Sequence, residues 1–363
     1  MALNSIVLKR AASLAAAINL IVPLFHADRI RDDQWHLRFL SIDSAHKQNL
    51  GEGVTVATVD TGVSPHSDLR KNLTSGTDLI TGGNGQQDIN SHGTSMAGLI
   101  AAHGNGSGGA LGIAPRSRIL PVRIAAQDGR GTPDDVAAGI DWAIEHEAKV
   151  ISVSYAGASS ARLRMSVDRA AREDTIVVAA AGNRPESLAV GFPAALDGVL
   201  AVGAVGRDGE HAELSVTGEA VAITAPGVDI YSTSTNNNYS KGSGTSAATA
   251  IVAGAAALVR SKYPELSAPE VVHRLTATAT DKGAPGRDEQ YGYGVLNLVA
   301  ALTADVPPLS ASAAPPATSS AATPEHEGGG RLPWAVVVVL VAAGLALPLF
   351  LWMRYRRREG AVK

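Results

Sequence analysis

Residues 54–63 read Val-Thr-Val-Ala-Thr-Val-Asp-Thr-Gly-Val, in which the apolar run 54–59 is followed by the carboxylate of Asp60 and by Gly62. Such a run, without strict polar alternation, is typical of a strand buried on both faces of a sheet. Further strands are expected at 119–124, 150–154, 175–181 and 199–205, and helical patterns cover 92–103, 133–147, 161–172 and 246–262. This alternation predicts an α/β fold, a mostly parallel sheet covered by helices on both faces.

The composition of the whole chain limits its chemistry. The 363 residues include 31 Lys and Arg, 34 Asp and Glu and no Cys, which gives a formal net charge of −3. The absence of Cys excludes a disulfide scaffold, a thiolate zinc site and a cysteine nucleophile. The near-neutral charge argues against a dedicated nucleic-acid binder, which needs a basic face.

The N-terminus has the pattern of an export signal. Lys9 and Arg10 precede an apolar run over 11–25, which is followed by the small residue Ala27. This order predicts a secretory signal peptide over residues 1–27. An uncleaved N-terminal anchor stays open, because the expected cleavage site lacks the Ala-x-Ala form.

The C-terminus has the pattern of a membrane anchor. Residues 304–332 are rich in Pro, Ala and Ser and predict an extended linker. Residues 333–353 carry no charge and predict a transmembrane helix, and the basic tail 354–363 is expected to stay in the cytoplasm. We therefore expect a single-pass protein of the cell membrane with an extracytoplasmic domain over residues 28–303.

Three short segments carry side chains suited to catalysis. Asp60 directly follows the first strand, His92 opens a small-residue helix within Asn-Ser-His-Gly-Thr-Ser-Met-Ala-Gly, and Ser246 opens an apolar helix within Gly-Ser-Gly-Thr-Ser-Ala-Ala-Thr-Ala. Taken singly, Asp60 is typical of a turn, His92 of a structural or metal-binding residue, and Ser246 of a helix N-cap. The chain order Asp, His, Ser makes the combination much more specific.

These segments resemble the three signatures of the subtilisin-like serine proteases (subtilases), and the resemblance covers about three quarters of the chain. It implies a serine endopeptidase that hydrolyses peptide bonds through an acyl-enzyme. Ser246 would be the nucleophile, His92 the general base and Asp60 the group that orients His92. Asn183 matches the side chain of the oxyanion hole.

Two other segments imitate functional motifs. Ser95 also lies in a Gly-Thr-Ser string, but it follows His92 by only three residues, so we favour Ser246 as the nucleophile. The run 104–109 has the form Gly-x-Gly-x-x-Gly, but it follows a helix and not a strand, so it predicts a loop and not a dinucleotide site.

The resemblance also implies where a protein or peptide substrate binds. The segment after the third strand would pair with an extended peptide, and the end of the fourth strand would help to wall the pocket for the residue before the cleaved bond. The expected substrate-binding residues are Ser154, Tyr155, Ala156, Gly157, Ala180, Ala181 and Gly182.

Within this family, the chain most resembles the mycosins, the membrane-anchored proteases of type VII secretion systems. The resemblance rests on residues 30–37, on the expected signal, linker, span and basic tail, and on an N-terminal extension too short for a separate prodomain. It implies type VII secretion membrane components as partners. Two features depart from the family: this chain has no Cys for a disulfide, and Ala250 replaces a common Pro.

The sequence assigns no metal and no other cofactor. Many subtilases bind calcium, and residues 128–135 offer carboxylates, but without the spacing of an EF-hand. Thr132 is instead expected to cap a helix whose first turn holds Asp134 and Asp135.

Two other functions remain as alternatives to an anchored protease. One is a structural subunit of a secretion membrane complex with a dispensable protease activity, and the other is a soluble degradative protease.

Overall fold

The computed structural model describes residues 27–106, 108–125, 129 and 131–309. Its elements, in chain order, are α1 (Ala27–Asp33), α2 (Trp35–Phe39), α3 (Ile42–His46), β1 (Thr55–Asp60), β2 (Thr77–Asp78), α4 (His92–Ala101), β3 (Arg118–Arg123), α5 (Pro133–Glu145), β4 (Val150–Val153), α6 (Ala161–Arg172), β5 (Ile176–Ala180), β6 (Val199–Val205), β7 (Ile223–Pro226), β8 (Ile230–Thr233), the 3-10 helix η1 (Thr235–Asn237), β9 (Tyr239–Gly242), α7 (Thr245–Lys262), α8 (Ala268–Ala277) and α9 (Leu298–Thr303).

A parallel sheet forms the centre of the domain. Its strand order is β2-β3-β1-β4-β5-β6-β7, and every neighbouring pair is parallel. The predicted α/β class is therefore confirmed. A separate antiparallel hairpin, β8 with β9, precedes α7.

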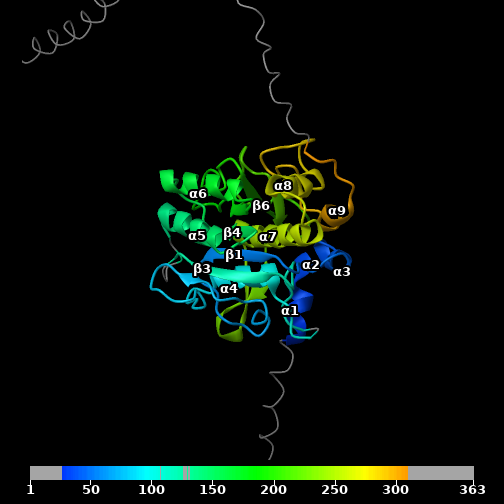
Figure 1. Ribbon diagram of the computed structural model, residues 1–363. Helices are drawn as coiled ribbons and strands as arrows, with labels where there is room; N and C mark the ends of the chain where they lie inside the picture. Colours follow the sequence, from blue (N-terminus) through cyan, green and yellow to red (C-terminus); the bar gives the residue numbers. More distant parts are fainter. Residues whose placement is uncertain (1–26, 107, 126–128, 130, 310–363) are drawn as a thin grey trace, which may run out of the picture. The chain divides into compact units, whose positions relative to one another are not determined.

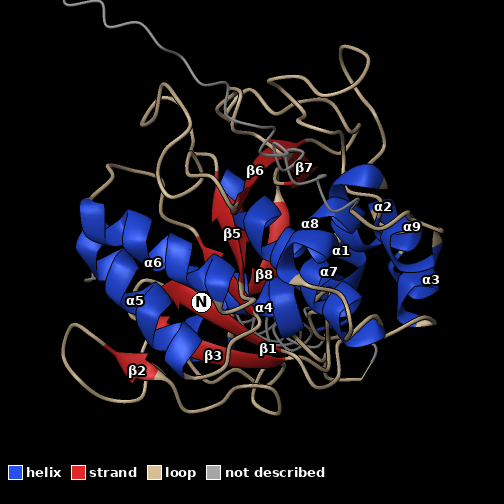
Figure 2. Ribbon diagram, turned by 45° about the horizontal axis from the view of Figure 1, so that its top comes forward, coloured by secondary structure: helices blue, strands red, loops and turns tan. Residues whose placement is uncertain are grey.

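Alternate residues of each strand enter different cores, because successive side chains point to opposite faces of a sheet. On β1, Val56 packs into one core with α4, α7 and α8, whereas Ala57 and Val59 pack into the other with α5 and α6. Figure 2 shows these two groups of helices on either side of the red strands. Both faces are covered, which explains the nearly continuous apolar runs of the strands.

Helix α7 is the most buried of the long helices among the described residues. Almost all of its side chains from Thr245 to Arg260 are buried, and most of them are Ala, Val or Gly. A Cβ at Gly254 would lie 2.7 Å from Ile113 Cβ, so the small residue is needed for close packing at this point. The tight packing of α7 holds its N-terminus at the carboxyl edge of the sheet.

The N-terminal extension folds as three short helices that the sequence analysis did not predict. Trp35 is 5% exposed, and its indole Nε1–H donates to Val228 O at 3.0 Å. Helix α3 contacts α9, so the N-terminal extension packs against the last helix of the domain (Figure 1). The extension is therefore part of the peptidase domain and not a separate unit.

Most of the predicted topology signals lie outside the described residues. These are the signal peptide up to residue 26, the linker from residue 310, the span 333–353 and the tail 354–363. No helix in the described part of the chain has the length and apolar character to span a membrane.

Candidate active site

The candidate site lies at the carboxyl edge of the sheet, where ligands bind in open α/β folds. Asp60 is the last residue of β1, and Asn183 lies three residues beyond β5. His92 and Ser246 stand at the N-terminal ends of α4 and α7, two helices that contact each other on one face of the sheet. The fold thus places the residues of the three sequence motifs at the starts and ends of neighbouring elements.

Asp60 and His92 form a direct pair. His92 Nδ1 lies 2.7 Å from Asp60 Oδ1, and the Thr61 backbone N–H donates to the same oxygen at 2.8 Å. The Asp60 side chain is 3% exposed, whereas that of His92 is 37% exposed. The carboxylate is therefore held inside the domain, while the other edge of the imidazole is open to a substrate.

The pair shifts the pKa of both partners. Burial by itself raises the pKa of Asp60, but the charge of His92 and the hydrogen bonds to the carboxylate outweigh it, so the pKa of Asp60 is lowered. Burial of His92 by itself lowers its pKa, because desolvation disfavours the charged imidazole. The charge of Asp60, its hydrogen bond and the charge of Asp88 outweigh this effect, so the pKa of His92 is raised. A buried carboxylate thus stabilises the protonated form of the imidazole.

Ser154 follows strand β4, which pairs with β1 so that Val153 lies opposite Val59, the residue before Asp60. The Ser154 hydroxyl helps to lower the pKa of Asp60. Ser154 Oγ and Asp60 Oδ2 are nevertheless both buried without a full hydrogen bond to the described residues. The side chain of Ser154, which the sequence analysis assigned to substrate binding, therefore interacts with Asp60.

Ser246 is the second residue of α7 and is half-buried. The N-cap of this helix is Gly244, so Ser246 is not an ordinary N-cap. Among the described residues, its hydroxyl forms no hydrogen bond, and none joins it to His92. Catalytic hydrogen bonds are often long or poorly aligned in substrate-free proteins, so this geometry does not argue against the pair. Ser95 lies on α4 itself, one turn beyond His92.

The carboxamide of Asn183 is oriented by the residue before Ser246. Asn183 Oδ1 accepts a hydrogen bond from Thr245 N at 2.9 Å and another from Thr245 Oγ1 at 3.2 Å. The amide nitrogen Nδ2 forms no hydrogen bond to the described residues. The donor end of the side chain is therefore available for a ligand beside the start of α7. Thr245 was not predicted from the sequence, because its role depends on the contact between the start of α7 and the loop after β5.

The predicted substrate-binding residues fall into two groups. Ser154, Tyr155 and Ala156 form no backbone hydrogen bonds to the described residues, so they present a free edge beyond β4. Gly157 forms an antiparallel bridge with Phe192, through bonds of 3.1 and 2.9 Å.

The second group is buried. Ala180 and Ala181 are 1% and 0% exposed, and Gly182, with φ of +117°, accepts a hydrogen bond from Val216 N. The side chains of Ala180 and Ala181 therefore do not reach solvent.

The residues described here offer no cluster of three or more His, Asp or Glu that could hold a metal ion. Asp128 of the possible calcium loop lies outside the described residues. The capping prediction for the adjacent helix is confirmed, because Thr132 Oγ1 accepts from Asp135 N and the Asp135 carboxylate accepts from Thr132 N. Asp134 accepts from Ser160 Oγ at 2.6 Å.

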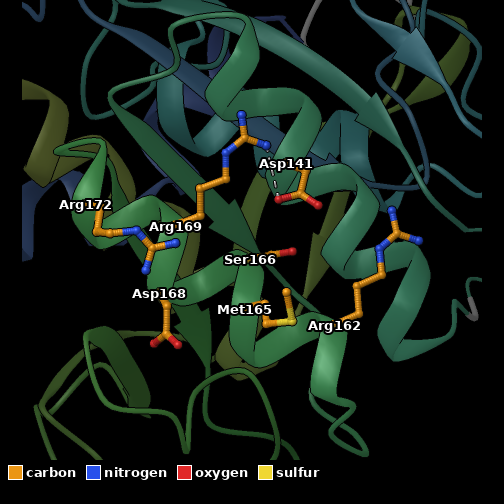
Figure 3. A pocket seen from close by; sticks show the side chains of 7 residues that line it. All are labelled: Asp141, Arg162, Met165, Ser166, Asp168, Arg169 and Arg172. Carbon is orange, nitrogen blue, oxygen red and sulfur yellow. Dashed lines mark hydrogen bonds and ion pairs between the residues drawn. The ribbon is translucent and has the colours of Figure 1, made fainter.

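A surface pocket on α5 and α6 contains none of these site residues (Figure 3). Arg169 in this pocket pairs with Asp141 at 3.5 Å and with Glu145 at 3.1 Å. Of the charged residues that line this pocket, Arg169 and Asp141 are therefore already paired with each other. It is lined by Asp141, Arg162, Met165, Ser166, Asp168, Arg169 and Arg172.

A parallel α/β domain that carries an Asp–His pair, a helix-terminal Ser and an oriented Asn has the architecture of a serine peptidase. The model of the subtilase family (peptidase S8) matches residues 51–294. The chain belongs to this family and is a serine endopeptidase of the subtilisin-like type.

Curated relatives and solved structures agree with this classification. A thermostable alkaline protease of Halalkalibacterium halodurans is 40% identical over 72% of this chain and 72% of its own length. Subtilisin DY of Bacillus licheniformis is 38% identical over 77% of this chain and 97% of its own length.

Among solved structures, MycP1 with its N-terminal propeptide removed has a TM-score of 0.70 and 30% identity, over 76% of this chain and 98% of its own. The MycP3 protease from a type VII (ESX-3) secretion system has a TM-score of 0.66 and 31% identity, over 75% of this chain and 88% of its own. The resemblance to mycosins is confirmed.

Proposed function

We propose that this chain is a membrane-anchored, extracytoplasmic serine endopeptidase in which Ser246, His92 and Asp60 form the catalytic triad. The observation that carries the proposal is the 2.7 Å contact between His92 Nδ1 and buried Asp60 Oδ1. This contact fixes one tautomer of the imidazole and leaves Nε2 to accept a proton from Ser246.

The reaction would proceed in two stages. Ser246 Oγ attacks the scissile carbonyl while His92 takes its proton, and His92 then donates that proton to the leaving amine. Water, deprotonated by His92, hydrolyses the acyl-enzyme that remains. Ser246 is regenerated, and the acyl product leaves as a carboxylic acid.

Charge on the carbonyl oxygen would be stabilised from two sides. Asn183 Nδ2 is the side-chain donor, since Oδ1 is already bound to Thr245. The backbone N–H of Ser246 lies in the first turn of an 18-residue helix, where N–H groups have no partner within the helix and the helix dipole favours negative charge. Such preorganised donors supply much of the rate enhancement in acyl transfer.

The substrate would be a protein or peptide in extended conformation. The free edge of Ser154–Ala156 can form β-type hydrogen bonds with it, and Gly157 and Phe192 close one end of this edge. Small residues behind the edge leave room for a side chain of the substrate.

The cellular role rests on the resemblance to mycosins and on the sequence of the two ends. A signal over 1–27, a linker over 304–332, a span over 333–353 and a basic tail over 354–363 would hold the peptidase domain outside the membrane. Type VII secretion membrane components are the partners that this resemblance suggests.

The test uses the full-length chain and its Ser246→Ala variant, with two readouts: cleavage of an internally quenched peptide library and protein secretion by cells. We expect the variant to lose cleavage. Unchanged cleavage would overturn the assignment of the nucleophile, and lost cleavage with normal secretion would favour the structural-subunit alternative. Recovery of the intact chain in the soluble fraction would overturn membrane anchoring.

A further inference from the structure

Asp88 lies in the loop just before helix α4, and its carboxylate accepts several hydrogen bonds. The residue is 5% exposed. Its Oδ1 accepts from Thr61 Oγ1 at 2.9 Å, from Asn90 N at 3.0 Å and from Ser91 N at 2.9 Å. Its Oδ2 accepts from Thr94 N at 2.9 Å and from Thr94 Oγ1 at 2.6 Å. A buried carboxylate with this many donors is held in a single geometry.

The carboxylate of Asp88 performs the capping that the N-cap of α4 does not. Ser91, the N-cap, has left-handed backbone angles and makes no side-chain cap hydrogen bond. Asp88 instead accepts the otherwise unpaired N–H groups of Ser91 and Thr94, which flank His92 on either side. The start of the helix, and with it the Cα of His92, is thereby fixed by Asp88.

The same carboxylate reaches the residue that follows Asp60. Thr61 Oγ1 donates to Asp88 Oδ1 and accepts from Gly93 N at 3.0 Å. Thr61 N in turn donates to Asp60 Oδ1. A continuous chain of hydrogen bonds therefore joins Asp88 to both backbone segments that carry the Asp60–His92 pair.

Asp88 also acts on His92 through its charge. Among the described residues, Asp60 and Asp88 are the ionisable groups whose charges act on the imidazole, and each raises the pKa of His92. Asp60 reaches His92 from β1, and Asp88 from the loop before α4. Helix α4 itself carries no other charged residue.

From these contacts we infer that Asp88 is a positioning residue of the active site, which holds the Asp60 loop and the start of α4 in register so that His92 meets Asp60. The inference rests on the proposed catalytic triad. It adds a second carboxylate, after that of Asp60, to the machinery, and this carboxylate touches neither the substrate nor the reacting atoms.

The first test is the kinetics of Asp88→Asn in the full-length chain. Because this change weakens the acceptor and misplaces His92, kcat should fall by about 10- to 100-fold. KM should change little. The acid limb of the kcat/KM profile should move to lower pH, because a negative charge near His92 is removed. An unchanged kcat with an unchanged acid limb would overturn the inference.

Asp78→Asn is the matched control. Asp78 is 6% exposed and accepts from Ile80 N, Thr81 N and Thr81 Oγ1, and it pairs with Arg123 at 2.8 Å. It lies on β2 at the edge of the sheet, outside the proposed machinery. This variant should lose thermal stability and keep its kcat and its acid limb. An equal kinetic loss in both variants would mean that Asp88 has only a structural role.

A second variant covers the case in which Asp88→Asn does not fold. Thr61→Val leaves the carboxylate in place and removes the hydroxyl that links it to the Asp60 loop. We expect a fall in kcat, and less than additive losses when the two changes are combined, because they act through one contact. Fully additive losses in the double variant, or wild-type kinetics in Thr61→Val, would contradict the inference.

A measurement without catalysis separates this inference from the proposed function. In the Ser246→Ala background, the His92 imidazole is titrated by NMR, with the signal assigned through His92→Ala. Adding Asp88→Asn should lower the pKa of His92, whereas adding Asp78→Asn should not. If the pKa of His92 is lowered but the chain shows no protease activity, Asp88 is coupled to His92, and only the proposed catalytic role of the triad is rejected. An unshifted pKa would overturn the coupling itself.

Discussion

Asn183 Oδ1 accepts a hydrogen bond from the backbone N–H of Thr245 at 2.9 Å. The contact joins residues 62 positions apart in sequence and decides which end of the Asn183 carboxamide is free. A backbone N–H can only donate, so the atom facing Thr245 must be the oxygen, and the nitrogen Nδ2 is left for the substrate.

Asn183 is therefore predicted to stabilise the transition state and not the bound substrate. Asn183→Leu keeps the approximate size of the side chain and removes the donor. We expect kcat to fall by about 10²- to 10³-fold, with little change in KM. Steady-state kinetics with a single quenched peptide measure both values, and a rise in KM with constant kcat would assign Asn183 to ground-state binding instead.

The pH dependence of activity follows from the raised pKa of His92. His92 must be neutral to accept a proton, and its pKa lies above the ordinary value of 6.5. The acid limb of kcat/KM should therefore have its midpoint above pH 6.5. A midpoint at or below 6.5 would contradict the observed environment of His92.

The same pair should stabilise the fold within a defined pH window. Because the pKa of Asp60 is lowered, its contribution is full above the ordinary 3.8 and is lost as the pH falls through the lowered value. Because the pKa of His92 is raised, its contribution is full below 6.5 and is lost as the pH rises through the raised value.

Thermal melting of the Ser246→Ala protein, with and without His92→Ala, measures this contribution. The difference between the two proteins should be greatest between about pH 4 and pH 6.5. A difference that does not vary with pH would show that the Asp60–His92 ion pair makes no contribution to stability.

Gly93 is predicted to be essential for the approach of α4 to β1. A Cβ at this position would lie 2.0 Å from Gly62 O and 3.2 Å from Asp60 Cβ. Gly93→Ala should therefore push His92 away from Asp60 and reduce kcat by about 10²-fold, since catalysis is sensitive to displacements near 1 Å. Gly242→Ala is the control, because a Cβ there meets nothing within 4 Å, and it should retain wild-type kinetics.

Ser154→Ala tests the interaction behind Asp60. The hydroxyl helps to hold Asp60 in its ionised form, so its removal should raise the pKa of Asp60. We expect a loss of kcat that stays below about tenfold, since Ser154 makes less than one full hydrogen bond to this charged group. If KM rises and kcat does not fall, Ser154 acts only on the substrate.

The sheet was largely predictable from local sequence, and the contacts around the site were not. The apolar runs placed β1, β3, β4, β5 and β6 within one residue of their observed ends, because strands buried on both faces leave an unbroken apolar signal. Strand β7 is short and ends in Pro226, and the hairpin of β8 and β9 is partly polar, so neither produces such a run.

The residues of the candidate site also fall into those that local sequence reveals and those that it does not. Asp60, His92 and Ser246 stand in distinctive local strings, so a single sequence was enough to single them out. Asp88, Thr61 and Thr245 act through contacts between separate segments of the chain, and no spacing along the chain reveals such contacts. Ser154 is expected to bind substrate by resemblance to the family, and the effect of its hydroxyl on Asp60 becomes visible only once β4 is paired with β1.

The most direct test of the account is covalent labelling of the full-length protein with a fluorophosphonate, followed by mass spectrometry of the modified peptide. We expect one adduct, on Ser246, and a large loss of labelling in His92→Ala, because Ser246 becomes nucleophilic only when His92 takes its proton. An adduct on Ser95, or labelling of Ser246 that does not change in His92→Ala, would contradict it.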